Sequence, residues 1–188
     1  QRSDPMNDYR FAVQASNPRF ISTFDAADES LSDAIQTVFP LETEYALIVW
    51  NWIYIPLSYK YDISMMARDL IDLIELMSSS ESGRRTIQWP SNTFASTWNI
   101  AWSNELTTVN AEWECVLGET ESMLAAKPII RLRTADFISE WKRLLETVVG
   151  ALTAAGYTSE HLVEMRLLKD VVGEIKHDGL LYRGSTTG

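Results

Sequence analysis

Carboxylates on the polar sides of two regular segments are the residues whose type and spacing could do chemistry. Asp69, Asp72 and Glu75 follow one another at intervals of three, and Glu112 and Glu114 at an interval of two. Paired carboxylates can act as general acid and base when a desolvated cleft shifts their pKa values. Both sets lie opposite the apolar residues of their segments, so we expect solvated charges rather than a catalytic pair.

Histidine and cysteine give no pattern for metal or nucleophilic chemistry. His161 and His177 are the only histidines, and the single cysteine, Cys115, is far from both in the sequence. A zinc site or a Cys-His pair would need these residues to converge without any supporting local spacing. We expect surface or helix-end histidines and a small, buried Cys115. Glycine-rich phosphate loops and a Gly-x-Ser-x-Gly elbow are also missing, so we predict no catalytic residue, no metal and no cofactor.

The acidic trio belongs to a predicted helix over residues 62–77, with Asp62 as its N-cap. A second helix is predicted over residues 134–155, capped by Thr134 and closed at Gly156. Apolar residues recur at helical spacing in both segments, and Trp141 lies in the middle of the second stripe. We therefore predict that Trp141 is buried. Shorter helices are expected over residues 31–38 and from residue 159 onward.

The two glutamates belong to the second strand of a predicted hairpin. Apolar and polar residues alternate over residues 98–102 and 109–117, which is typical of half-buried strands. A turn at Ser103-Asn104 would place Trp98 opposite Val109 and bring the apolar faces together. The glutamates then lie on the face away from the core.

The most hydrophobic stretch, residues 45–57, predicts two further strands. Residues 45–50 are apolar throughout, which favours a central strand covered on both faces. Pro56 has no N–H for a ladder, so the second strand must end there or lie at a sheet edge. A leading hairpin is expected over residues 9–24, because Asn17-Pro18 is a turn signal.

These segments predict an α+β fold with a mainly antiparallel sheet packed by amphipathic helices. The sheet should contain residues 45–57 and 97–117, and the helices over 62–77 and 134–155 should cover one side of it. Strand pairs that alternate irregularly with helices favour this class over a parallel sheet.

Composition favours one domain. The chain has 188 residues, of which 46% are hydrophobic, enough for a substantial core. We expect the domain over residues 6–183, vector-derived residues at 1–5 before Met6, and a frayed tail at 184–188. One cysteine excludes an internal disulfide framework, and no long apolar run occurs, so a cytoplasmic protein that does not enter a membrane is expected.

The formal charge of −10 is distributed unevenly. Residues 1–83 carry 13 acidic and 5 basic groups, residues 84–126 carry 5 and 2, and residues 127–188 carry 8 and 9. An acidic surface repels nucleic acids and anionic membranes, and it attracts basic proteins. The alternative is that the acidity only maintains solubility.

The segment Ile55-Pro-Leu-Ser-Tyr-Lys-Tyr-Asp-Ile-Ser64, the Trp-Pro-Ser at residues 89–91 and the tryptophan-rich hairpin together resemble bacterial immunity proteins of polymorphic-toxin systems, of the contact-dependent or type VI kind. The resemblance extends over residues 6–183. It implies a non-catalytic, cytoplasmic protein that binds and neutralises a cognate toxin domain by direct contact. Because such toxins often use basic clefts, a basic partner is expected.

The residues expected to bind this partner are the charged side chains held on regular structure, together with one aromatic anchor at the end of the hairpin. They are Asp69, Asp72, Glu75, Trp102, Glu112 and Glu114.

Two other classes of function remain open. A small-molecule enzyme would have an aromatic-lined pocket, and a carboxylate of shifted pKa in that pocket would favour it. A self-associating structural or adaptor protein would use the aromatic hairpin to form a homodimer or larger assembly. A mass that depends on concentration would favour this second class.

Overall fold

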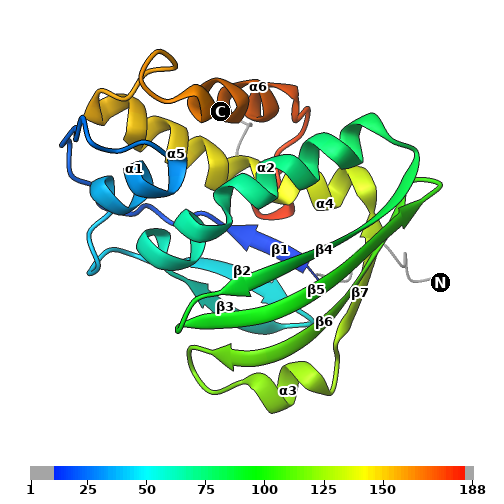
Figure 1. The fold of residues 1–188 in the computed structure, drawn as a ribbon. Coiled ribbons are helices and arrows are strands. Elements are labelled where there is room, and N and C mark those ends of the chain that lie inside the picture. The colour runs from blue at the N-terminus through cyan, green and yellow to red at the C-terminus, as the bar shows by residue number, and fades with distance from the viewer. Residues whose placement is uncertain (1–10, 185–188) are drawn as a thin grey trace.

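Two antiparallel sheets, in place of the single sheet expected, form the β part of the fold (Figure 1). The structure is a computed structural model that describes residues 11–184. The strand orders are β1-β2-β3 and β4-β5-β6-β7. The strands are β1 (Phe11–Gln14), β2 (Ala46–Trp50), β3 (Ile53–Leu57), β4 (Ser82–Pro90), β5 (Phe94–Ser103), β6 (Leu106–Val116) and β7 (Ile129–Arg133). The expected single α+β domain with antiparallel pairing is confirmed. Residues 1–5 and most of the expected tail lie outside the described residues.

Most helices gather on one side of the sheets, as expected, and α3 lies at the opposite end of the molecule (Figure 1). The helices are α1 (Leu31–Val38), α2 (Ser64–Ser79), α3 (Glu121–Ala125), α4 (Thr134–Glu140), α5 (Lys142–Ala155) and α6 (Val163–Glu174), with a π-helical turn η1 (Tyr59–Ile63) and a 3₁₀ turn η2 (Leu180–Tyr182). The helix expected over residues 134–155 is two helices that meet at Trp141. The Trp141 amide bonds to the Ile138 carbonyl, which tightens the helix at this point.

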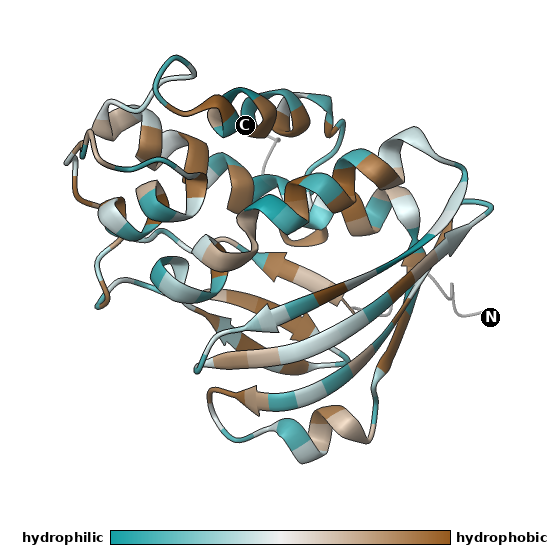
Figure 2. Cartoon of the chain, viewed as in Figure 1, coloured by the Kyte–Doolittle hydropathy of each residue, from teal (hydrophilic) through white to brown (hydrophobic). Residues whose placement is uncertain are grey.

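The three-stranded sheet is mostly apolar (Figure 2), and Gln14 at the end of β1 is polar and exposed. Strand β2 is central, as expected, and Pro56 lies in β3 at the edge of the sheet. Ile48 and Trp50 face the main core, while Val49 on the other face is 8% exposed. The continuous apolar run thus corresponds to a strand that is covered on both sides.

A tight turn of this sheet meets the edge of the other sheet. Asn51 and Trp52 form the two-residue turn between β2 and β3, both with positive φ. The Asn51 side-chain amide donates to the Lys127 carbonyl (2.8 Å) and to the Ile129 carbonyl of β7 (3.1 Å). Side-chain hydrogen bonds from Asn51, and from Trp50 Nε1 to the Lys127 carbonyl (3.0 Å), therefore join the two sheets here in place of a backbone ladder.

The predicted tryptophan-rich hairpin is confirmed as β5–β6, with a shifted turn. Asn104 and Glu105 form the turn, so Trp98 lies opposite Ala111 instead of Val109. The shift of two residues leaves the same side chains facing the core. A bulge between Ala95 and Ser96 then reverses the faces near the end of β6. For this reason Cys115 is half-buried rather than buried as expected.

Aromatic rings fill the space between the sheets and the helices. Trp98 lies centrally, with ring centroids 5.2 Å from Trp50, 5.3 Å from Trp89 and 6.3 Å from Trp141. Trp141 is fully buried, which confirms the prediction made from its helical stripe. Its ring also contacts Phe11 of β1 at 5.9 Å. This cluster joins both sheets to the α4–α5 junction.

Three local predictions are wrong. Thr134 is not the N-cap of α4, because Arg133 holds that position and the Thr134 hydroxyl bonds to the Thr107 hydroxyl. Strand β1 pairs with β2, and no leading hairpin forms within the described part of residues 9–24. Asp62 is not an N-cap, because the chain is already helical at Tyr59 and the Ser58 hydroxyl accepts from the Tyr61 amide. The Asp62 carboxylate is instead buried, where it accepts hydrogen bonds from the Ser58 amide and from hydroxyl groups of the β4–β5 turn.

Candidate functional site

Glu112 and Glu114 lie exposed on strand β6, as predicted. They belong to the outer face of the four-stranded sheet, whose middle row is Thr86, Asn99 and Asn110. The Thr86 hydroxyl bonds to the Asn99 side chain at 2.8 Å. Neither glutamate forms an ion pair with another described residue. Their charges are therefore held on a rigid strand and face solvent.

The acidic trio on α2 is less available than its spacing suggested. Asp72 accepts from Arg68 Nε at 2.9 Å, and the same guanidinium lies 3.5 Å from Glu164 of α6. Asp69 is half-buried and Glu75 is exposed. The ion pair therefore leaves two acidic residues of the trio, Asp69 and Glu75, without a basic partner among the described residues, and one of these is half-buried.

The prediction that Trp102 is an accessible anchor at the end of the hairpin is wrong. The side chain is 3% exposed, and its Nε1 donates to the Ser80 carbonyl at 3.2 Å. The ring packs against Gly83, where a Cβ would lie 2.4 Å from the nearest ring atom. The absence of a side chain at Gly83 lets the ring lie flat on β4. A buried ring in this position is not an exposed anchor.

The structure exposes two other aromatic side chains that the sequence reasoning did not select. Trp52 is 56% exposed and Tyr54 is 62% exposed. Trp52 has φ of +72°, a left-handed conformation that favours glycine and is rare for a bulky residue. In the sequence, the signal for this turn is the Asn51-Trp52 pair between two apolar runs. A two-residue hairpin turn at such a place would ordinarily read Asn-Gly.

The exposed aromatics and the exposed glutamates come from neighbouring elements. Asn51 binds the carbonyls of Lys127 and Ile129 at the β7 edge, and the adjacent β6 amide of Ala111 donates to the Pro128 carbonyl at 3.0 Å. Glu112 directly follows Ala111. We call this region the turn surface, defined by the residues Trp52, Tyr54, Glu112, Glu114 and Ile129, of which Ile129 is also exposed.

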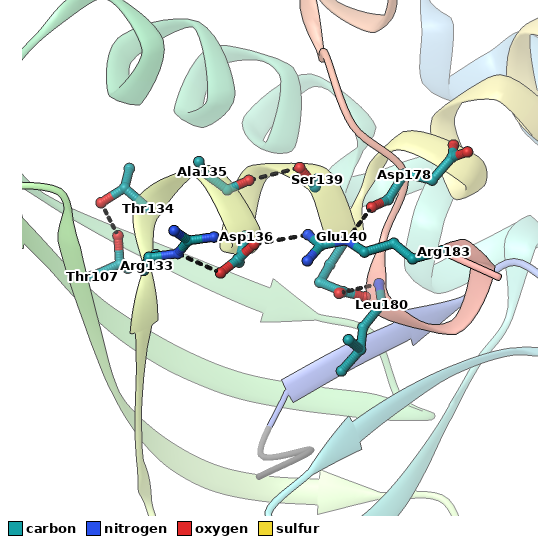
Figure 3. A network of polar contacts seen from close by, with 10 residues as sticks. All are labelled: Thr107, Arg133, Thr134, Ala135, Asp136, Ser139, Glu140, Asp178, Leu180 and Arg183. Atoms are coloured by element: carbon teal, nitrogen blue, oxygen red, sulfur yellow. Dashed lines mark hydrogen bonds and ion pairs between the residues drawn. The ribbon is translucent and has the colours of Figure 1, made fainter. Parts of the chain in front are cut away.

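A hollow of about 980 Å³ lies at the far end of the four-stranded sheet. Trp102 lines it, together with a charged network at the β7–α4 junction (Figure 3). Asp136 accepts from Arg133 Nε at 3.0 Å and from Arg183 Nη2 at 2.7 Å. Burial alone would raise the pKa of Asp136, but the bonds from the two arginines leave it below its ordinary value. Both carboxylate oxygens are occupied, so this group positions guanidiniums.

Glu140 lies behind that network and ties both ends of the described chain to α4 (Figure 3). Its two carboxylate oxygens accept from the Val13 amide at 3.0 Å and the Leu180 amide at 2.7 Å. Burial raises the pKa of Glu140, and the two backbone donors oppose that rise. A Cβ on Gly179 would lie 2.8 Å from this carboxylate. The arrangement is a structural clasp.

A second buried carboxylate, Asp62, links η1 to the β4–β5 turn. It accepts from the Ser58 amide at 2.7 Å and the Thr93 hydroxyl at 2.8 Å, and it also bonds to the Ser91 hydroxyl. Burial raises the pKa of Asp62 despite these donors. Because every donor belongs to a neighbouring loop, the carboxylate holds those loops together.

The remaining predictions concern metals, histidines and membranes. Within residues 11–184, no group of three or more histidine, cysteine or acidic residues could hold a metal ion. His161 is half-buried, with Nε2 3.0 Å from the Asp28 carbonyl, and His177 is exposed. None of the helices in the described range is both long and apolar enough to cross a membrane.

Comparison of the chain with protein-family models, curated proteins and solved structures found no match.

Proposed function

We propose that this protein is a non-catalytic, cytoplasmic immunity factor that binds a basic toxin domain through the turn surface. The observation that carries the proposal is Trp52. A large aromatic side chain occupies a left-handed turn position where glycine is favoured, and more than half of the ring faces solvent. Strain of this kind costs about 1–2 kcal/mol. A function for the exposed ring would explain why that cost is tolerated.

The composition of the turn surface supports a protein partner. Tryptophan and tyrosine are the side chains that most often dominate the energy of protein interfaces. Trp52 and Tyr54 supply them here, and Ile129 adds apolar area. Glu112 and Glu114 provide uncompensated negative charge beside these anchors, which would speed the approach of a basic partner.

The exposed aromatic side chains Trp52 and Tyr54 favour the turn surface over α2 as the contact surface. Asp72 is paired with Arg68, so the net charge of the α2 face is lower than its three acidic residues suggest. We therefore place the principal interface on the turn surface and assign Asp69, Asp72 and Glu75 at most a role in long-range attraction.

The hollow gives limited support to the enzyme alternative. It contains a carboxylate of shifted pKa, Asp136, but the shift is downward and two arginines occupy both oxygens. A general acid needs a raised pKa and a general base needs an accessible oxygen. The hollow is better suited to binding than to proton transfer.

Co-expression with the toxin whose gene we expect beside this one is the decisive test. We expect the toxin to arrest growth alone and to be tolerated when this protein is present. A harmless toxin, or one that remains lethal in the presence of this protein, would refute the proposal.

Variants of the turn surface then locate the interface. Trp52→Gly should abolish protection while leaving the thermal unfolding midpoint unchanged or higher, because it relieves the turn. Glu105→Gly makes the same change in the other hairpin turn and should leave protection intact. Loss of protection with both variants, or with neither, would remove Trp52 from the interface.

Charge reversal separates the two acidic regions. Glu112→Lys with Glu114→Lys should slow toxin association about tenfold and flatten its salt dependence. Reversal of the α2 trio should have a smaller effect. An equal or larger effect from the trio would move the interface to α2.

A further inference from the structure

Strand β4 is one edge of the four-stranded sheet, and it pairs only with β5. The Ser91 amide donates to the Phe94 carbonyl at 3.2 Å, so residues 91 and 94 form a hydrogen-bonded pair of the β4–β5 hairpin. Hydrogen-bonded pairs alternate with non-bonded pairs along an antiparallel ladder. The backbone groups of residues 85, 87 and 89 therefore bond to β5, whereas those of Arg84, Thr86 and Gln88 point away from the sheet.

These outward backbone groups form a free row along the edge. Arg84, Thr86 and Gln88 are all exposed, and their amide and carbonyl groups have no hydrogen-bond partner among the described residues. Pro90 belongs to the same set and has no N–H, which costs no ladder bond at a free edge. A row of unpaired donors and acceptors is a template for another strand. The β4 edge can therefore accept an antiparallel strand.

The charges on this edge favour an acidic partner. Arg84 and Arg85 are the only basic residues in the stretch from residue 69 to residue 126. Neither forms an ion pair within the described part of the chain. Arg85 lies on the same face as the buried Ile87 and is nevertheless exposed, so α2 leaves the edge open at this position. A second copy of this chain, with a formal charge of −10, is an acidic partner.

Helix α2 runs along β4 in the opposite direction and supplies negative charge on the same side of the sheet (Figure 1). Just before its start, Asp62 accepts from the Thr93 hydroxyl beyond one end of β4 (2.8 Å), and residues 80–81 join its last turn to the other end. Asp69 and Glu75 have no basic partner in residues 11–184. A second copy paired at β4 would bring its own α2 to this side of the sheet, where Arg85 lies.

We propose that two copies of this chain associate through their β4 edges, antiparallel and centred on Thr86. The two four-stranded sheets then become one continuous sheet. In this register Thr86 lies opposite Thr86 of the second copy, and Arg84 lies opposite Gln88. Each of the outward amides of these residues then meets a carbonyl. The register also pairs two threonines, which is favourable across strands, and it keeps the arginines of the two copies apart.

This inference goes beyond the proposed function. The turn surface includes Ile129 of β7, the edge of the sheet opposite to β4. The dimer therefore leaves the turn surface of each copy open to a toxin.

Analytical ultracentrifugation of the full chain tests the proposal, and we expect a mass that rises from one copy to two with concentration. Thr86→Pro removes the central edge amide without removing a bond to β5, and it should raise the dimer dissociation constant about tenfold or more. Thr86→Val keeps that amide and should stay within about threefold of the parent. A chain that is monomeric at every concentration would leave the edge to an acidic strand of another protein and would overturn the proposal. Equal dimerisation of Thr86→Pro and the parent would also overturn it.

Cysteine cross-linking tests the register and does not depend on the proline variant. Thr86→Cys places two thiols on directly opposed residues, with Cα atoms about 5.5 Å apart, within the range of a disulfide. Mild oxidation should link this variant into a covalent dimer. In Gln88→Cys, the matched control, the Cα atoms of the two introduced cysteines are roughly 14 Å apart, so the variant should remain unlinked. Equal linking of both variants would overturn the register.

Protection against the toxin separates this inference from the proposed function. Thr86→Pro should leave protection intact, and Trp52→Gly should leave the dimer intact. Loss of the dimer in Trp52→Gly would place the contact between copies at the turn surface and overturn the role of β4.

Discussion

The two sheets of this protein differ in how many of their faces are covered. In the three-stranded sheet, Ile48 is buried on one face and Val49 is nearly buried on the other. In the four-stranded sheet, Trp98 is buried on the inner face, while Asn99 and Asn110 are exposed on the outer face. A continuous apolar run produces the first sheet and strict alternation produces the second. The three-stranded sheet is therefore covered over most of both faces, with Tyr54 of β3 exposed at its edge, while the four-stranded sheet presents an open outer face.

The hairpin turns of the two sheets share a backbone conformation but differ in chemistry. Asn51-Trp52 and Asn104-Glu105 both have two successive positive φ values. The first turn carries an exposed tryptophan and contacts the neighbouring sheet through Asn51. The second carries an exposed glutamate beside the hollow. The same turn geometry thus presents an apolar group at one end of the molecule and a charged group at the other.

The largest effect is expected where the two sheets meet. Trp141→Ala should lower the free energy of unfolding by roughly 3–5 kcal/mol, because it leaves a cavity among the rings of Phe11, Trp89 and Trp98. The loss should come from packing alone, since Trp141 Nε1 has no hydrogen-bond partner among the described residues. Urea unfolding measures it. Val163→Ala, at a side chain 82% exposed, is the control and should change little. An unchanged midpoint for Trp141→Ala would mean that the sheets do not depend on this junction.

The clasp that holds β1 should come next in size. In Glu140→Gln, one of the two buried backbone amides of Val13 and Leu180 would face an NH₂ group instead of an acceptor. We expect a loss of roughly 1–3 kcal/mol in unfolding free energy. Faster hydrogen exchange at the Val13 or Leu180 amide would localise it. If neither amide exchanges faster, the carboxylate is not the clasp we describe.

A matched pair of substitutions tests the contrast between covered and open faces directly. Val49→Thr places a hydroxyl on the covered outer face of β2 and should cost roughly 1–2 kcal/mol. Thr108→Val makes the opposite change on the open face of β6 and should lie within about 0.5 kcal/mol of the parent. Chemical denaturation of both variants gives the comparison. Equal effects would show that the two outer faces are alike.

The turns should respond in the opposite direction. Trp52→Gly and Glu105→Gly each place glycine at a left-handed position, φ of +72° and +67° respectively. We expect each to raise the free energy of unfolding by roughly 0.5–1 kcal/mol. Thermal unfolding provides the measurement. Destabilisation by Trp52→Gly alone would indicate that the ring stabilises the joint between the sheets.

The last and smallest effect is expected for Asp62→Asn. The difference in unfolding free energy between this variant and the parent should be small at low pH and should grow as pH rises. Burial raises the pKa of Asp62 above its unfolded value. The associated stability is therefore fully present below the unfolded pKa, near 4, and is lost as pH rises through the folded pKa. In Asp62→Asn the side-chain carbonyl can still accept from the Ser58 amide. The Ser91 and Thr93 hydroxyls can accept from the new NH₂ group, because a hydroxyl accepts as well as donates. The unfolding free energy of the variant should gain on that of the parent as pH rises. Parallel pH profiles would refute the raised pKa.

Local patterns in the sequence predicted most elements but not their assembly. The apolar run at residues 45–50, the proline at 56 and the alternation around Trp98 each predicted a strand and its environment correctly. The two sheets meet where the Asn51 side chain binds carbonyls 76 and 78 positions away at the β7 edge, a contact that local patterns do not reveal. The leading hairpin failed because β1 pairs with a distant strand that is more hydrophobic than the nearby segment.

The candidate site was predictable only where it depends on alternation. Glu112 is exposed because β6 alternates, and the sequence contains that signal, whereas Glu114 lies at the bulge opposite Ala95 and Ser96. Trp102 alternates as well and is buried for the same reason, so position near a hairpin end was a poor guide to exposure. Trp52 is exposed because the turn falls at residues 51–52, which two adjoining apolar runs do not reveal.

The ring cluster also determines how the protein can be observed. Trp50, Trp89, Trp98, Trp113 and Trp141 form a chain of neighbours with centroid separations between 4.9 and 6.2 Å. At such separations indole transitions couple, and excitation passes between rings before it is emitted. Trp102 packs on Gly83 of β4, and Trp52 is 56% exposed at the β2–β3 turn. Emission from these five indoles, of which Trp113 is only partly buried, should therefore change together when the sheets separate, while the exposed ring of Trp52 should respond most to events at the surface.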